Sequence, residues 1–179
     1  MKKKILCTAA LAAMISACAI PAPTAEAFSI GDIIGIAQGA AQYALLDKEF
    51  NYYNNTEEGR QELFKSYQEK LGVVHDEAKE AELSSIMSRL TASIGAEDPS
   101  IYDKPYLYFI CADESFNAFC SMGHVMVVND GLFKYLTNTD ELAVVLGHEM
   151  GHGQKDHVVN AMHKKAKTEL GAAVISGAL

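Results

Sequence analysis

The stretch Val144-Val145-Leu146-Gly147-His148-Glu149-Met150-Gly151-His152 carries the pattern HExxH, and it follows a cluster of helix-capping residues at 137–141. Residues four apart lie one turn along a helix on nearly the same face, so His148 and His152 can hold one metal ion. Glu149 then projects beside that ion. The pattern predicts a helix with two zinc ligands, His148 and His152, and a general base, Glu149.

These residue types suit the hydrolysis of peptide bonds. Zinc polarises a scissile carbonyl and acidifies a water molecule, and the neighbouring carboxylate takes the proton of the water and passes it to the leaving amine. The alternative is a pair of surface histidines on an ordinary amphipathic helix. That alternative explains the pattern poorly, because the segment is the most apolar part of the helix and an unpaired Glu149 there would be costly.

A zinc site needs at least a third ligand, and later residues offer candidates. His157 follows His152 by five residues, about 140° around a helix, so it joins the site only if the helix breaks. His163 is eleven residues on, about 16 Å along the axis. We expect both to be surface groups or groups that support a ligand. Asp156 is expected to be a solvated carboxylate unless it orients an imidazole.

The rest of the chain predicts an α+β fold in one domain. The predicted helices cover about 28–46, 56–71 and 76–95, with a polar break at 51–56. Aromatic and β-branched runs at Tyr106–Cys111 and Val125–Val128 predict two buried strands, joined by a loop at 112–123. A short helix follows Gly131. We therefore expect a mainly helical domain with a small sheet beside the HExxH helix.

The composition excludes some partners. The chain has 179 residues, 49% of them hydrophobic, and a formal net charge of -8. Without residues 1–27 it carries 12 basic and 22 acidic residues. This acidity argues against nucleic acid as a partner.

The first 27 residues predict a signal peptide. Lys2-Lys3-Lys4 precedes an apolar run from Ile5 to Ile20, and Ala25-Glu26-Ala27 has the small residues of a cleavage site. The mature chain would begin at Phe28. A retained membrane helix is a weaker interpretation, because the run is shorter than the ~20 apolar residues that a span needs.

A lipoprotein signal is the alternative, because Ile15-Ser16-Ala17-Cys18 has the order that precedes lipid attachment. An acyl chain on Cys18 would tether the protein to a membrane. Either signal predicts an exported protein, in the periplasm or another extracytoplasmic compartment. Outside the signal region two cysteines remain, Cys111 and Cys120. They are expected either to form a disulfide or to stay as two buried thiols.

The order of the motifs resembles a known peptidase family from about Tyr106 to His157. This family includes the type I CAAX prenyl protease, the HtpX heat-shock protease and soluble periplasmic quality-control proteases. The matching features are Asn117-Ala118-Phe119, a turn at Gly123, the strand Val125–Val128, Gly131-Leu132-Phe133, the run Glu141–His152, and His157.

The resemblance implies a gluzincin fold, with an active-site helix under a small sheet. It implies zinc held by His148, His152 and a Glu from a later helix. It also implies that Asn117-Ala118-Phe119 leads into a sheet edge along which an extended substrate lies, which fits a protease of broad specificity. Taken alone, Asn117-Ala118-Phe119 would be a simple turn with a buried aromatic residue.

The third ligand is where the sequence departs from this family. The Glu-containing motif that supplies it is absent before Leu179, and Glu169 is the only carboxylate after Asp156. On a continuous helix Glu169 would lie about 25 Å from His152, so it is not the expected ligand. We therefore expect the third ligand beyond Leu179, in a longer natural protein.

Together these features predict an exported zinc metalloendopeptidase, with residues 28–179 forming a C-terminally incomplete peptidase domain. Its expected substrates are polypeptides, namely unfolded or damaged envelope proteins. The alternative is a catalytically inactive peptide-binding or chaperone-like protein that lacks the third ligand.

Overall fold

A computed structural model describes residues 39–136 and 138–175, so the predicted signal peptide lies outside the described residues. The chain divides into two units, one formed by residues 1–51 and 159–179 and the other by residues 52–158. The elements in chain order are α3 (Gly39–Asn55), α4 (Glu57–Leu71), α5 (Glu77–Glu97), η1 (Pro99–Tyr102), β1 (Leu107–Cys111), β2 (Ala118–Ser121), η2 (Met122–His124), β3 (Val125–Asn129), α6 (Asp130–Tyr135), α7 (Thr139–Gln154) and α8 (His157–Ile175).

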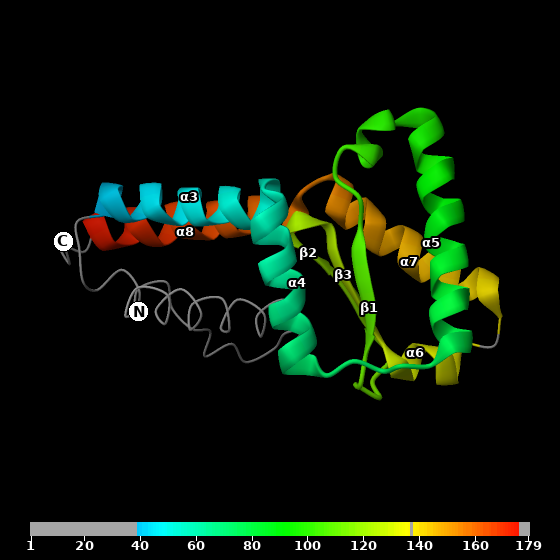
Figure 1. Cartoon of the computed structure of the whole chain (residues 1–179). Coiled ribbons are helices and arrows are strands. Elements are labelled where there is room, and N and C mark those ends of the chain that lie inside the picture. Colours follow the sequence, from blue (N-terminus) through cyan, green and yellow to red (C-terminus); the bar gives the residue numbers. More distant parts are fainter. Residues whose placement is uncertain (1–38, 137, 176–179) are drawn as a thin grey trace. The chain divides into compact units, whose positions relative to one another are not determined.

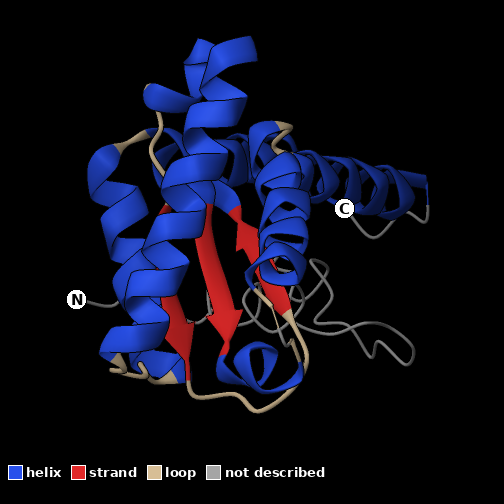
Figure 2. Ribbon diagram, turned by 90° about the vertical axis from the view of Figure 1, so that its right-hand side faces the viewer, coloured by secondary structure: helices blue, strands red, loops and turns tan. Residues whose placement is uncertain are grey.

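The unit of residues 52–158 is built on a three-stranded mixed sheet in the order β1-β3-β2 (Figure 2). Strand β1 runs parallel to β3, whereas β2 runs antiparallel to it. Every residue of β3 is buried, as expected for a strand that is covered on both faces. The sheet and the surrounding helices confirm the predicted α+β class.

Helices cover the two faces of this sheet. Met126 and Val128 of β3 join the core that α5 and α7 cover. Phe109 and Phe119 point to the opposite face, where their rings pack against Phe64 and Tyr67 of α4. In Figure 1, α4 and the pair α5 and α7 accordingly lie on opposite sides of the strands. The alternating side chains of the strands thus feed two separate layers of core.

The helix starts follow the capping residues in the sequence. Thr56 caps α4 by accepting a hydrogen bond from the backbone of Gly59, and Asp76 caps α5 in the same way. Asn138 caps α7 by accepting from Glu141 N at 2.9 Å. These three caps confirm the predicted beginnings of the helices, because short polar side chains satisfy the free N–H groups of the first turn.

The predicted polar break at 51–56 is wrong, because α3 continues to Asn55. Its polar residues have partners that keep them helical. Asn51 Nδ2 donates to Asp47 O at 2.9 Å, and Asn54 Oδ1 accepts from Gly123 N at 2.7 Å. Only Thr56 leaves the helix, and it does so as the cap of α4.

The predicted loop 112–123 contains a strand, β2, that was not predicted from the sequence. Strand β2 has only four residues and no β-branched side chain, so it lacks the usual sequence signal. Its pairing with β3 and its packing against α7 stabilise it instead.

Of the two alternatives for Cys111 and Cys120, the structure has two buried thiols and not a disulfide. Both thiols are free and buried. Cys111 pairs with Asn129 and Cys120 with Met126, on opposite sides of β3. Two strands that flank a third lie about 10 Å apart, which exceeds the reach of a disulfide of about 7 Å between Cα atoms. Burial raises the pKa of both thiols, so they behave as small core residues.

In the other unit, α3 and α8 pack on each other. Ala166 is fully buried against Tyr43 and Leu46. His163 Nδ1 lies 3.0 Å from the hydroxyl of Tyr43, and its ring lies against Phe50. His163 is therefore a packing residue of this unit. Of the helices in the described part of the chain, none combines the length and apolar character that crossing a membrane requires.

Candidate active site

Helix α7 presents two different faces. Leu142, Leu146 and Met150 recur every four residues and are buried against the sheet and α5. On the other side Val144 is 73% exposed and His148, one turn later, is exposed as well. The apolar residues around the HExxH pattern thus anchor the helix, while its histidines remain accessible.

The two histidines of the pattern converge. His148 Nε2 and His152 Nε2 lie 3.1 Å apart, and their rings are tilted by 70°. Two nitrogen ligands of a tetrahedral zinc ion lie about 3.3 Å apart. The two side chains therefore fit as neighbouring ligands of one metal ion.

The side chain of Glu149 extends from α7 to strand β2. Its Oε2 accepts a hydrogen bond from the backbone N–H of Cys120 at 3.2 Å. Burial raises the pKa of its carboxyl above the ordinary value, and the nearby His152 and His148 act in the opposite direction. A held carboxylate with a raised pKa is a better proton acceptor at neutral pH than a solvated one.

Strand β2 forms an edge of the sheet beside Glu149. Since backbone groups alternate along a strand, Ala118 presents its N–H and C=O to the same edge as Cys120. Asn117 precedes the strand, and its carbonyl accepts from Asn129 N at 3.1 Å. The side chain of Phe119 is 8% exposed and packs against Tyr67, so it belongs to the core. The groups that this edge presents are therefore the backbone N–H and C=O groups of Ala118 and Cys120.

The expectation that one continuous helix runs from His152 through residues 158–167 is wrong. The helix ends at Gln154, and Asp156 takes a left-handed conformation with φ 47° before α8 begins at His157. This break turns His157 toward the site. His157 Nδ1 lies 2.9 Å from His152 Nδ1, and the ring centroids are 4.8 Å apart.

Asp156 is also not the solvated carboxylate that we expected. Its Oδ1 accepts from Asn54 Nδ2 at 3.1 Å and lies 3.5 Å from Lys104 Nζ. Asn54 is 102 residues away in the sequence, so no local pattern could have indicated this contact. Neither partner of Asp156 was predicted from the sequence.

Among the side chains that the structure describes, those of residues 43–136 and 138–168, no group of three metal-binding side chains is found. Glu169 belongs to the other unit, and its side chain is outside the described part. The candidate ligands in the described part are therefore His148 and His152.

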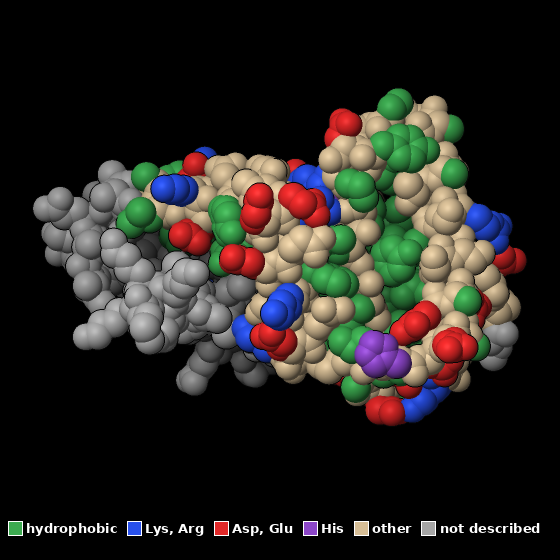
Figure 3. Space-filling model, viewed as in Figure 1, with side chains coloured by type: hydrophobic (Ala, Val, Ile, Leu, Met, Phe, Trp, Pro, Cys, Tyr) green, Lys and Arg blue, Asp and Glu red, His purple; other side chains and the backbone are tan. Residues whose placement is uncertain are grey.

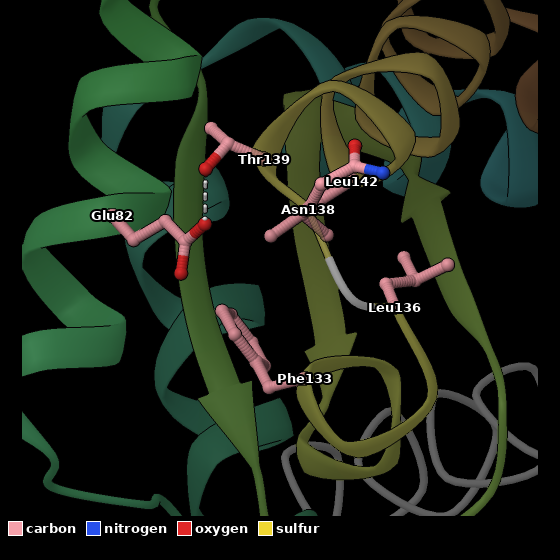
Figure 4. A pocket seen from close by; sticks show the side chains of 6 residues that line it. All are labelled: Glu82, Phe133, Leu136, Asn138, Thr139 and Leu142. Carbon is pink, nitrogen blue, oxygen red and sulfur yellow. Dashed lines mark hydrogen bonds between the residues drawn. The ribbon is translucent and has the colours of Figure 1, made fainter.

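Two other surface features are separate from this constellation. A small pocket at the beginning of α7 is lined by Glu82, Phe133, Leu136, Asn138, Thr139 and Leu142. There the hydroxyl of Thr139 donates to Glu82 Oε1 at 2.8 Å, which ties α7 to α5 (Figure 4). Hydrophobic side chains also gather on the surface between β1 and α5, as Figure 3 shows. The histidines of the pattern do not line the pocket.

The unit of residues 52–158 thus places an HExxH helix on a small mixed sheet, with a carboxylate beside two histidines. The sequence profile of peptidase family M48 matches residues 77–178, more than half of the chain. The chain therefore belongs to peptidase family M48, which confirms the resemblance found in the sequence.

Several curated relatives are proteases of the same family type. The beta-barrel assembly-enhancing protease of Yersinia pestis is 33% identical over 63 residues, which are 35% of this chain and 13% of that protein. The protein of the same name from Escherichia coli K12 is 31% identical over 64 residues, 36% of this chain and 13% of its own. A third relative, from Vibrio cholerae, has the same name with a provisional assignment. It is 30% identical over 95 residues, which are 53% of this chain and 19% of that protein. The chain thus spans less than a fifth of the length of these relatives.

Proposed function

We propose that this chain is the catalytic region of a zinc-dependent metalloendopeptidase, with His148 and His152 as zinc ligands and Glu149 as the general base. The observation that carries the proposal is the pair of Nε2 atoms 3.1 Å apart with Glu149 fixed beside them. Membership of peptidase family M48 supports the protease activity. The two imidazole nitrogens support zinc as the metal, since histidine nitrogen is a common ligand of this ion.

In the proposed hydrolysis of a peptide bond, each residue of the site has a separate role. A bound zinc ion supplies polarisation of the scissile carbonyl and a more acidic water. Glu149 would accept a proton from the attacking water at its carboxylate and pass that proton to the leaving amine. The N–H of Cys120 holds Glu149 Oε2 in place, and partial burial keeps the affinity of the carboxylate for a proton high.

The substrate is proposed to be an extended polypeptide that adds to the edge of β2. Backbone groups of Ala118 and Cys120 lie along that edge, next to Glu149. Hydrogen bonds to backbone accept many sequences, which suits unfolded or damaged proteins. The proposed substrate-binding segment is Asn117, Ala118 and Phe119. Its backbone pairs with the substrate, while the side chain of Phe119 packs in the core.

The proposed location is the cell envelope, outside the cytoplasm. Residues 1–27 have the pattern of a signal peptide, with Phe28 as the mature start, and a lipid on Cys18 is the alternative that would add membrane association. The relatives are named for enhancing the assembly of beta-barrels, which supports envelope polypeptides as the substrate class.

The test is the hydrolysis of casein by the full chain with zinc. Glu149→Gln should lower kcat by about 10²–10⁴-fold, because it removes the proton acceptor. Zinc binding, measured by isothermal titration, should remain. Glu141→Gln changes a carboxylate in the first turn of the same helix and should keep both properties, so it serves as the matched control.

Equal cleavage of casein by Glu149→Gln and the parent would overturn the assignment of the base. Binding of unfolded casein by the zinc-loaded parent, without any cleavage, would show instead that the chain is a peptide-binding module.

A further inference from the structure

The two ring nitrogens of His152 face different histidines. Its Nε2 lies 3.1 Å from His148 Nε2, and its Nδ1 lies 2.9 Å from His157 Nδ1. The imidazole of His152 is therefore fixed at both ends. His157 itself is exposed, so the contact belongs to the open face of the site.

The break between α7 and α8 creates this contact. On a continuous helix His157 would point about 140° away from His152. The left-handed conformation of Asp156 reverses that direction, and Asp tolerates this conformation better than most residues. Asn54 and Lys104 hold the Asp156 carboxylate, so the break is anchored to the body of the unit.

The proton on His152 must then occupy a defined nitrogen. A neutral imidazole carries one N–H, and a nitrogen that binds a metal must offer its lone pair. If Nε2 binds the metal beside His148, the proton is on Nδ1 and is donated to His157 Nδ1. His157 accepts it there and carries its own proton on Nε2.

We propose that His157 is a positioning residue that fixes the ring orientation and the proton location of His152 for metal binding. This inference rests on the proposed zinc site. His157 approaches the nitrogen of His152 that faces away from His148, so it supports the ligand and is not itself a ligand. Groups that orient a metal-binding histidine in this way commonly change the metal affinity by about 10–100-fold.

Three substitutions of His157 separate the hydrogen bond from simple packing. Asn places a polar atom near the position of Nδ1, Gln places one near Nε2, and Phe keeps the ring without either nitrogen. His157→Asn should keep the zinc affinity of the parent within about threefold. His157→Phe and His157→Gln should weaken it by about 10–100-fold. His75→Phe is the control, because His75 is exposed on a different segment, with a side chain 83% accessible.

Isothermal titration with zinc and long-range ¹H–¹⁵N NMR of the metal-free full chain provide the two readouts. In the parent and in His157→Asn, the NMR spectrum at pH 8 should show His152 protonated mainly on Nδ1. In His157→Phe the proton should redistribute toward Nε2. The thermal unfolding of all three variants should match that of the parent, because the contact is exposed.

The inference is overturned if His157→Phe keeps both the zinc affinity and the proton location of the parent. It is also overturned if Asn and Phe weaken zinc binding equally, because the hydrogen bond would then have no role. If the parent binds no zinc, the proposed function fails, but the NMR spectrum still decides whether His157 sets the proton location on His152.

Discussion

The turn at η2 and the open face of α7 use histidine in opposite ways. His124 in the turn is 5% exposed, its Nδ1 lies 2.7 Å from the carbonyl of Lys104, and its ring stacks on Tyr106. On α7, His148 is exposed, and its Nε2 lies 3.1 Å from His152 Nε2. His124 is buried, hydrogen-bonded and stacked, whereas the nitrogens of His148 and His152 converge on the open side of α7. Residue type alone does not distinguish these two roles.

The turn is held by buried polar contacts. Arg60 is 4% exposed and donates through Nε to Gly123 O at 2.7 Å and through a terminal nitrogen to Pro105 O. Asn54 accepts from Gly123 N. Gly123 has φ 70°, and a Cβ there would lie 2.6 Å from Tyr53 O, so only glycine fits. This region is expected to contribute stability and no chemistry.

The first prediction compares a substitution in each region. Arg60→Leu removes the donors to two carbonyls near the turn and should lower the free energy of unfolding by about 3 kcal/mol. His148→Ala, on the open face, should change it by less than about 0.5 kcal/mol. Urea unfolding measures both values.

Arg89→Leu controls for the loss of a positive charge, because Arg89 is exposed on α5. Its free energy of unfolding should stay within about 0.5 kcal/mol of the parent. A loss from Arg60→Leu as small as that of the control would remove the contrast between the turn and the open face.

The sequence predicted the features that depend on local signals. The caps at Thr56, Asp76 and Asn138 gave the starts of three helices, because a cap is a short-range interaction. The apolar run at Val125–Val128 gave the central strand. The HExxH pattern gave the helix and the convergence of its histidines, since both follow from helical spacing.

Features that depend on distant contacts could not be predicted in this way. Strand β2 is defined by its pairing with β3, and the helix break at Asp156 by contacts with Asn54 and Lys104. A non-glycine residue with positive φ has only a weak sequence signal, because Asp, Asn and His adopt this conformation more often than other residues but still rarely. The position of His157 followed from that break, so helical spacing placed it on the wrong side.

The second prediction uses two glycines of α7 that face the two environments. A Cβ at Gly153 would lie 2.7 Å from Tyr106 Oη and 2.9 Å from Cys120 Sγ, whereas one at Gly151 would meet nothing within 4 Å. Gly153→Ala should lower the free energy of unfolding by about 1–3 kcal/mol through overpacking. Gly151→Ala should raise it by up to about 1 kcal/mol through helix propensity.

Urea unfolding of the two single variants provides the measurement, and each variant is the control for the other because both introduce one methyl group into the same helix. A stabilised Gly153→Ala would mean that the buried side of α7 can relax around an added methyl group. The distinction between a packed face and an open face would then be lost.

The smallest expected effect is a dependence of stability on pH that comes from His124. Burial lowers its pKa below the ordinary value of about 6.5, although the hydrogen bond to the Lys104 carbonyl and the nearby Asp156 act in the opposite direction. The folded protein therefore binds fewer protons at this site than the unfolded chain does. Stability is then lost as the pH falls from about 6.5 toward the lowered pKa, and it is fully present above about 6.5.

His124→Asn should remove this component. Asn tolerates the left-handed φ of 55°, and its amide can donate to Lys104 O as the imidazole does, but it does not titrate. The variant loses the stacking on Tyr106, so it should be less stable than the parent at pH 7.5, and the difference should shrink at pH 5.5. Tyr106→Leu removes the stack and keeps the titrating group, so its difference from the parent should not shrink in this way. Urea unfolding at both pH values decides the matter: a constant difference for His124→Asn would mean that the buried imidazole makes no contribution to the acid sensitivity of the fold.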